Sequence, residues 1–410
     1  MNGLRIFRYL AAIAGLLPPV IPVRAQSADS TRATPASDER SSLRLASSGD
    51  VTLTLGGYLQ VDGRMLSASE QPTPDGLLLR RARLVFDAQM PSGWHVRIQP
   101  DFGQGRVVIQ DAFVGFERQS GIIRIGRFRP AFGVERSQSS ASLLHGERSL
   151  ANALMPSRSF GAQASLRRGS MSIAIGGFRT PIGNSPQLVD TDGDVDAVVG
   201  SGYDGLVRIA WAPRRAARYF DAQIAVLSGT EQGDLAATGL SRLLTVGQQP
   251  LLAFRNDGTA AGTTTASGPR TRVLLGGVAG DAHFVTAIEG TVFTQQVRLD
   301  ARRQVSAGAL VWRAAYVRGG TRQPTQEIRP SGPRGAIDIG IRAGGLGVWG
   351  QELATVITRR SVTHALSSGV AVAWVPTVLT RLSLGYDITL VRRGAEVREH
   401  FLLLRVQQGF

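Results

Sequence analysis

The chain of 410 residues contains no cysteine, and all 46 of its basic residues other than histidine are arginine, since lysine is absent too. The absence of cysteine excludes disulfides and thiolate metal sites, and it suits a chain that crosses an oxidising compartment. Aromatic residues make up only 6%, and the mean hydropathy is +0.00. Such a balanced composition excludes a helical membrane protein, although a barrel with alternating polar and apolar residues fits it.

Long apolar runs are lacking beyond the amino terminus, so any membrane residence must be through strands. At that terminus, Arg5 and Arg8 precede the apolar run Tyr9–Val23, and the small residue Ala25 offers a cleavage site. We predict a signal peptide over residues 1–25. The alternative is a membrane anchor, but three prolines break the run short of the ~20 apolar residues that a spanning helix needs.

The rest of the chain divides into two parts. Residues 26–50 are rich in serine, arginine and alanine without an apolar period, which predicts a flexible periplasmic lead-in. Two or three soluble domains are possible at this length. No linker follows Asp50, however, so we expect residues 51–410 to form one domain.

Apolar and polar residues alternate with period two throughout that domain. In the last segment, Leu402, Leu404 and Val406 share the face of the terminal Phe410, and Arg405 and Gln407 take the other face. This pattern predicts an all-β fold, a transmembrane antiparallel barrel of about sixteen strands. The predicted strands are Val51–Met65, Leu78–Gln89, Trp94–Phe102, Val107–Glu117, Gly121–Arg129, Gly161–Arg168, Ser170–Arg179, Tyr203–Trp211, Tyr219–Leu227, Thr271–Ala279, Ala282–Thr294, Gly308–Val317, Ala336–Gly344, Ser367–Val375, Leu379–Leu390 and Arg398–Phe410.

The connections alternate between short and long, as barrels with short periplasmic turns and long external loops require. Arg318–Arg334 breaks the rule, because the alternation places this long stretch on the periplasmic side. It is either a real exception or the sign of a miscounted strand. Trp94, Trp211 and Trp374 each adjoin a short turn on the apolar face, where an interfacial aromatic girdle belongs.

Charge follows the same alternation. A set of arginines occupies the polar faces and would point into the lumen: Arg81, Arg83, Arg97, Arg124, Arg208, Arg313, Arg342 and Arg381. Guanidinium groups in a narrow aqueous pore favour anions. The alternative is that these arginines pair with lumenal carboxylates and brace the wall, the candidates being Asp62, Asp101, Asp111, Asp338 and Asp387. We expect most of them to pair and a minority to set selectivity. The export signal argues against a nucleic-acid partner.

Several motifs resemble the phosphate-selective porin O and P family. They are Gly56-Gly57-Tyr58 with Asp62, Leu79–Leu84, Asp111–Gly115, Ile125–Glu135, Glu147-Arg148, Pro156–Gly161 and Gly335–Asp338. The resemblance implies a trimeric outer-membrane porin of sixteen strands, in contact with lipid and lipopolysaccharide, that needs no cofactor. Its solutes would diffuse passively, with a preference for inorganic anions such as phosphate or polyphosphate. Without lysine, we expect an anion-leaning general porin.

The resemblance also assigns roles to residues. The third external loop, Pro130–Phe160, would fold into the lumen and form a constriction. Arg80 or Arg81 would lie near this constriction with Asp111. Glu147 and Arg148 would anchor the loop to the wall, and Arg158 also belongs to it.

Three other interpretations stay open. Ser228–Arg270 is long enough to plug the lumen, which would give a structural barrel without conduction. His145 with Ser142 or Ser149 suggests a barrel phospholipase, but no orienting group or oxyanion hole is marked. Alternating carboxylates in the fourth external loop form a weak calcium candidate, whose members are Asp190, Asp192, Asp194 and Asp196.

Overall fold

The computed structural model describes residues 43–48, 51–67, 75–179, 201–213, 218–393 and 395–410. The predicted signal peptide and the calcium candidate lie outside these residues. Within them, no helix is long and apolar enough to cross a membrane.

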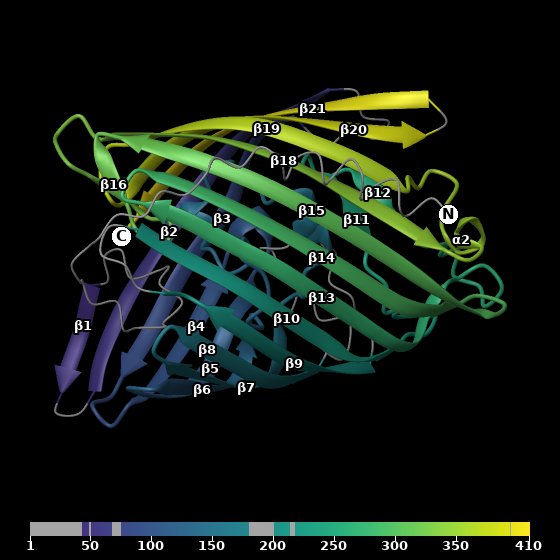
Figure 1. Cartoon of the computed structure of the whole chain (residues 1–410), viewed down its shortest axis with the longest axis horizontal. Coiled ribbons are helices and arrows are strands. Elements are labelled where there is room, and N and C mark those ends of the chain that lie inside the picture. The colour runs from purple at the N-terminus through teal and green to yellow at the C-terminus, as the bar shows by residue number, and fades with distance from the viewer. Residues whose placement is uncertain (1–42, 49–50, 68–74, 180–200, 214–217, 394) are drawn as a thin grey trace.

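Sixteen antiparallel strands form one closed barrel (Figure 1). The first nine are β2 (Val51–Ser67), β3 (Gly76–Gln89), β4 (Trp94–Asp101), β5 (Val108–Arg118), β6 (Gly121–Phe128), β7 (Ser159–Arg168), β8 (Met171–Arg179), β9 (Ser201–Trp211) and β10 (Arg218–Gln232). The other seven are β13 (Thr265–Asp281), β14 (Phe284–Arg298), β15 (Arg302–Arg318), β18 (Ala336–Gly350), β19 (His364–Val375), β20 (Thr380–Arg393) and β21 (Ala395–Gly409). Each strand pairs with the next, and β21 pairs with β2 from Tyr58↔Gly409 to Ser67↔His400, which leaves no open edge in the barrel. The sixteen predicted strands correspond one to one with these.

The alternation places apolar side chains outside and polar ones inside. On β21, Leu404 is 50% exposed and Val406 45%, whereas Arg405 and Gln407 are each 2% exposed. A soluble protein has the opposite arrangement. The outer surface is therefore suited to hydrocarbon, and the polar groups are satisfied within the lumen.

One further strand, β1 (Leu43–Ser48), lies in the stretch for which the sequence predicts a flexible lead-in. It pairs with β2 from Leu43↔Leu55 to Ser48↔Val51. The reason lies in the end of β21, whose last residue pairs with Tyr58 and so leaves the first residues of β2 without a neighbour on that side. β1 takes this position and satisfies their backbone groups.

Short turns lie at one end of the barrel and long connections at the other. The carboxy terminus lies at the short-turn end, and the short helix α2 (Leu353–Val356) lies at the opposite end (Figure 1). The stretch between β15 and β18 is a real exception to the alternation, because it forms a small hairpin of β16 (Gly320–Arg322) and β17 (Ile328–Pro330) at the short-turn end. No strand was miscounted there.

The predicted tryptophan girdle is on the outside of the barrel. Trp94, Trp211 and Trp374 are 44–48% exposed and lie beside short turns. Trp94 packs against Phe116 with ring centroids 5.0 Å apart, and Trp211 packs against Phe220 at 5.5 Å. These aromatic rings mark the interface at the short-turn end.

Closure depends on a close approach between Gly57 and the terminal residue. Gly57 and Phe410 exchange backbone hydrogen bonds of 3.2 and 3.1 Å. A Cβ at position 57 would collide with the Arg83 carbonyl oxygen and come within 2.7 Å of the Phe410 ring.

We therefore expect Gly57→Ala to lower the melting temperature of the refolded barrel, because β2 must move away from β3 and from the Phe410 ring to admit the methyl group. Heat-modifiable electrophoretic mobility measures the folded fraction. Gly177→Ala is the matched control, because a Cβ there meets nothing within 4 Å. Equal melting of the two variants would contradict this account of the seam.

The lumen and its inward-folded loops

The loop between β6 and β7, residues 129–158, crosses the inside of the barrel. It contains two 3-10 turns, η2 (Ser140–Ser142) and η3 (Leu150–Leu154). β6 is the fifth strand counted from β2, and β18, the thirteenth, lies opposite it. Arg342 of β18 donates a hydrogen bond of 2.6 Å to the Glu147 carbonyl oxygen. The loop thus reaches the far wall of the lumen.

Glu147 is its strongest anchor. Its carboxylate accepts hydrogen bonds from Arg80 Nε at 2.8 Å, Arg64 Nη2 at 2.9 Å and Arg405 Nη2 at 3.1 Å, and the residue is 2% exposed. Burial by itself would raise the pKa of Glu147, but the charges of the surrounding arginines outweigh it and hold that pKa well below its usual value. The carboxylate is therefore ionised and binds the loop to strands β2, β3 and β21.

A β-bulge explains how two consecutive arginines of β3 serve the same site. The register steps from Gln60↔Arg81 to Val61↔Leu79, so Arg80 is the extra residue. Arg80 and Arg81 are therefore both buried, and Arg81 Nη2 lies 4.0 Å from the Glu147 carboxylate. Strict alternation would have turned one of them toward lipid. The sequence pattern alone does not reveal this bulge.

Asp111 is bound to the end of the loop. It accepts a 2.7 Å hydrogen bond from Arg158 Nε. Arg148, the other proposed anchor, donates to the carbonyl oxygens of Glu135 and Gln138 inside the loop. Those bonds stiffen the loop itself, whereas Glu147 and Arg158 hold it to the wall.

On the opposite wall of the lumen, the loop has a second attachment, which involves the two carboxylates of Glu289 and Glu135. Glu289 of β14 accepts hydrogen bonds from the backbone N–H groups of Val134 and Glu135. Glu135 in turn accepts a 2.6 Å hydrogen bond from Ser149 Oγ, and Arg313 of β15 lies 3.6 Å from its carboxylate. Burial raises the pKa of Glu135, but Arg313 and its neighbours outweigh this and lower it.

The hydrolase interpretation finds no geometric support in these contacts. The Ser149 hydroxyl donates to Glu135 and the Ser142 hydroxyl to the Ser139 carbonyl oxygen, while His145 Nδ1 has no hydrogen-bond partner. Neither serine is bonded to the imidazole. The imidazole is therefore not in place to activate either hydroxyl, and the proposed Ser–His pair is not formed.

Most lumenal arginines are paired with a carboxylate on the adjacent strand or on the strand after it, as the wall-bracing interpretation expects. Arg342 binds Asp387 through two hydrogen bonds of 2.8 Å, and Arg405 binds Asp62 at 2.6 and 2.7 Å. The other pairs are Arg83–Asp101, Arg97–Asp87, Arg381–Asp338 and Arg270–Asp204. Such pairs neutralise the wall and fix it in place.

Arg124 and Arg208 differ from these. Arg124 on β6 lies over the Phe113 ring at 5.3 Å, and Arg208 on β9 donates to the neutral Gln223 side chain at 2.5 Å. Among the described residues, neither guanidinium has a carboxylate within 4.0 Å. Both are half-buried, each three residues from the short-turn end of its strand. Their positive charge is therefore not neutralised by a direct ion pair.

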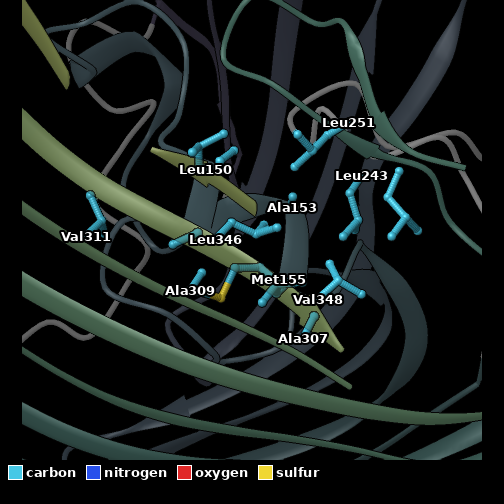
Figure 2. Close-up of a cluster of buried hydrophobic side chains, with 14 of the residues drawn as sticks. Leu150, Ala153, Met155, Leu243, Leu251, Ala307, Ala309, Val311, Leu346 and Val348 are labelled. Carbon is cyan, nitrogen blue, oxygen red and sulfur yellow. The ribbon is translucent and has the colours of Figure 1, made fainter. Parts of the chain in front are cut away.

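A second loop, residues 233–264 between β10 and β13, also turns inward. It contains β11 (Leu243–Leu244) and β12 (Pro250–Leu252), which form a small hairpin. Leu243 and Leu251 pack with η3 and with inward-facing residues of β15 and β18 (Figure 2). The sequence signal for this was only the length of the loop.

Comparison with known proteins agrees with this architecture. The model of the family "Phosphate-selective porin O and P" matches residues 53–336. The chain belongs to the phosphate-selective porin O and P family. Its members are outer-membrane β-barrel channels and not enzymes, so this chain is an outer-membrane porin.

Solved structures share the fold at low sequence identity. The outer membrane channel DcaP of Acinetobacter baumannii is 11% identical, with 90% of this chain and 99% of that chain covered and a TM-score of 0.59. An anion-selective porin from Comamonas acidovorans is 12% identical, with 88% and 100% covered and a TM-score of 0.52. In-vitro folded OmpT of Vibrio cholerae is 9% identical, with 90% and 99% covered and a TM-score of 0.51. No curated protein matches the chain.

Glu147→Ala tests the loop anchor. It leaves the arginines around Glu147 without the carboxylate that they bind, and breaking such a buried pair costs about 3–5 kcal/mol. We expect faster limited proteolysis within residues 130–158 of the porin and a lower melting temperature. Asp300→Ala, which removes the exposed partner of Arg303, is the control and should have little effect. An unchanged cleavage rate in Glu147→Ala would show that other contacts hold the loop.

The stability of the folded porin should depend on pH through His145. Burial and the charge of Arg342 lower the pKa of His145 well below its usual value of 6.5. The unfolded chain therefore takes up a proton near pH 6.5 while the folded chain does not, so stability is present above this pH and falls as the pH drops below it. We expect His145→Asn to flatten the melting temperature between pH 7.5 and 5. A slope identical to that of the unaltered porin would contradict the assignment.

Proposed function

We propose that this porin mediates passive diffusion of small hydrophilic solutes with a preference for anions, oxyanions such as phosphate among them. Membership of the family supports the class of solute, and the similar porin from Comamonas acidovorans is anion-selective, which agrees with it. That likeness extends to the fold alone. The finer preference must therefore be argued from this chain's own lumen.

The observation that carries the proposal is that Arg124 and Arg208 have no direct ion pair among the described residues. Most other lumenal arginines are offset by a carboxylate and contribute little net field. These two face the lumen near the short-turn end, and their direct contacts are with an aromatic ring and a neutral amide. Between walls of low dielectric constant, such charges raise the local concentration of anions. The remaining candidate pore-lining arginines then brace the wall more than they select ions.

A second candidate function is a plugged, non-conducting structural barrel. The apolar packing of the 233–264 loop inside the barrel favours it. The two candidates differ in conduction. A barrel that is only structural would pass no current in a planar bilayer.

Assembly and surroundings complete the proposal. The apolar outer surface contacts outer-membrane lipid. A homotrimer and contacts with lipopolysaccharide, both implied by the resemblance, stay predictions. Sedimentation of the detergent-solubilised porin measures the first of these.

The reversal potential in a planar bilayer under a potassium chloride gradient tests the proposal. We expect the unaltered porin to favour chloride. Arg124→Glu with Arg208→Glu should lower the anion-to-cation permeability ratio roughly fivefold, the factor that corresponds to about 1 kcal/mol of local ion energy.

Arg168→Glu is the matched control, because this exposed arginine also lies near the short-turn end of its strand but is outside the lumen. It should leave the ratio unchanged. An equal ratio in the double variant and in the control would refute the role of Arg124 and Arg208. Titration with phosphate then distinguishes a phosphate-binding channel, whose chloride current is blocked, from a general anion porin.

A further inference from the structure

We propose that residues 233–264, here named the strap, narrow the external mouth of the barrel, and that the contact between Thr245 of the strap and Glu399 of β21 holds the strap across it. The inference rests on the proposed conduction. It adds a device that sets how much current passes, separately from which ions are preferred.

The path of the strap is the first observation. It leaves β10, the ninth strand of the barrel, and returns to β13, the tenth. Between these ends, its turn at Thr245–Gly247 contacts β21, the sixteenth strand, and comes close to Leu66 of β2, the first. The ninth and first strands of a sixteen-stranded barrel lie opposite each other, so the strap spans the full diameter of the mouth.

The far attachment is a compact polar contact. Thr245 Oγ1 lies 2.7 and 2.9 Å from the two carboxylate oxygens of Glu399, and the Gly247 N–H donates to the same carboxylate at 3.2 Å. Glu399 is 5% exposed. A Cβ on Gly247 would lie 2.5 Å from the carboxylate and 2.7 Å from Leu66, so the turn fits closely against the wall.

The underside of the strap is apolar, and so is the wall that it covers. Leu251 and Leu252 are each 1% exposed, and they belong to one buried cluster with Ala307 of β15 and Val348 of β18 (Figure 2). Strand residues that face a water-filled lumen are ordinarily polar. These inward apolar residues are kept from water by η3 of the 129–158 loop and by the strap, which packs on η3. The closed arrangement is therefore the one favoured by this sequence.

The strap has a second attachment at the connection between β18 and β19. The Ala253 N–H donates to Ser361 Oγ at 3.0 Å, the Thr358 N–H donates to the Ala253 carbonyl oxygen at 2.9 Å, and Phe254 bridges Ile357. These backbone contacts tie the strap to the segment around α2. The side-chain contact at Glu399 is thus the attachment that a substitution can release while this segment stays in place.

Release of the strap should change the current without changing ion preference. Arg124 and Arg208 lie near the short-turn end of their strands, whereas Thr245 and Glu399 meet at the long-loop end. The electrostatic and the steric parts of the channel are therefore separable by mutation.

Single-channel recording of the full-length porin in planar bilayers tests the proposal with Glu399→Ala and Thr245→Val. Each removes one side of the contact, and the second leaves the barrel wall unaltered if the first folds poorly. We expect both to raise the mean current at least threefold with an unchanged reversal potential. Asp257→Ala, an exposed carboxylate of the same strap, should leave the current unchanged.

The absence of cysteine permits a complementary experiment. Thr245→Cys with Glu399→Cys, joined by a short reducible bis-thiosulfonate cross-linker, should hold the strap shut and reduce the current, and a reductant should restore it. Equal currents in the unaltered, released and cross-linked porins would overturn the strap. Absence of current even after release would overturn both the strap and the conducting function. A strap response without any anion preference would refute only the proposed selectivity.

Discussion

Pairing of β21 with β2 is the constraint on which the rest of the structure depends. In hydrocarbon, no water is present to satisfy an open strand edge, so the sheet must close on itself. Closure brings residues that are more than 340 positions apart in sequence next to one another, as in the Arg405–Asp62 contact. It also creates an enclosed lumen lined by buried charged side chains, such as Arg83, Arg342 and Asp387. The loops then fold against these charges.

The lumen combines two kinds of interior. Around Glu147, Arg64, Arg80 and Arg405 converge on one loop carboxylate, and pairs of arginine and aspartate line the neighbouring strands. Toward the long-loop end, leucine, valine and alanine from two loops and several strands form an apolar cluster. The polar part resembles a channel wall and the apolar part resembles a protein core. Both the polar and the apolar part are expected in a porin whose mouth is crossed by a loop.

The need to bind both the wall and a loop also explains how arginine, without lysine, can supply the positive charges of the lumen. A guanidinium forms two parallel hydrogen bonds with a carboxylate and can donate a third bond elsewhere, as Arg342 does to Asp387 and to the Glu147 carbonyl oxygen. One side chain thus braces the wall and holds the loop. The ammonium group of lysine offers no such planar fork.

The sequence by itself determined the strands and their facing, because period-two alternation is a local property of each segment, and the lengths of the connections indicated which of them share one end of the barrel. Leu404 and Arg405 could be assigned to lipid and lumen from their positions alone. Tertiary structure decided which charges meet: Asp111 pairs with Arg158, and the bulge at Arg80 turns two consecutive arginines inward. It also decided that β1 continues the sheet and that the strap crosses the mouth. These features depend on where β21 ends and on how loops cross an enclosed space, and no local pattern carries that information.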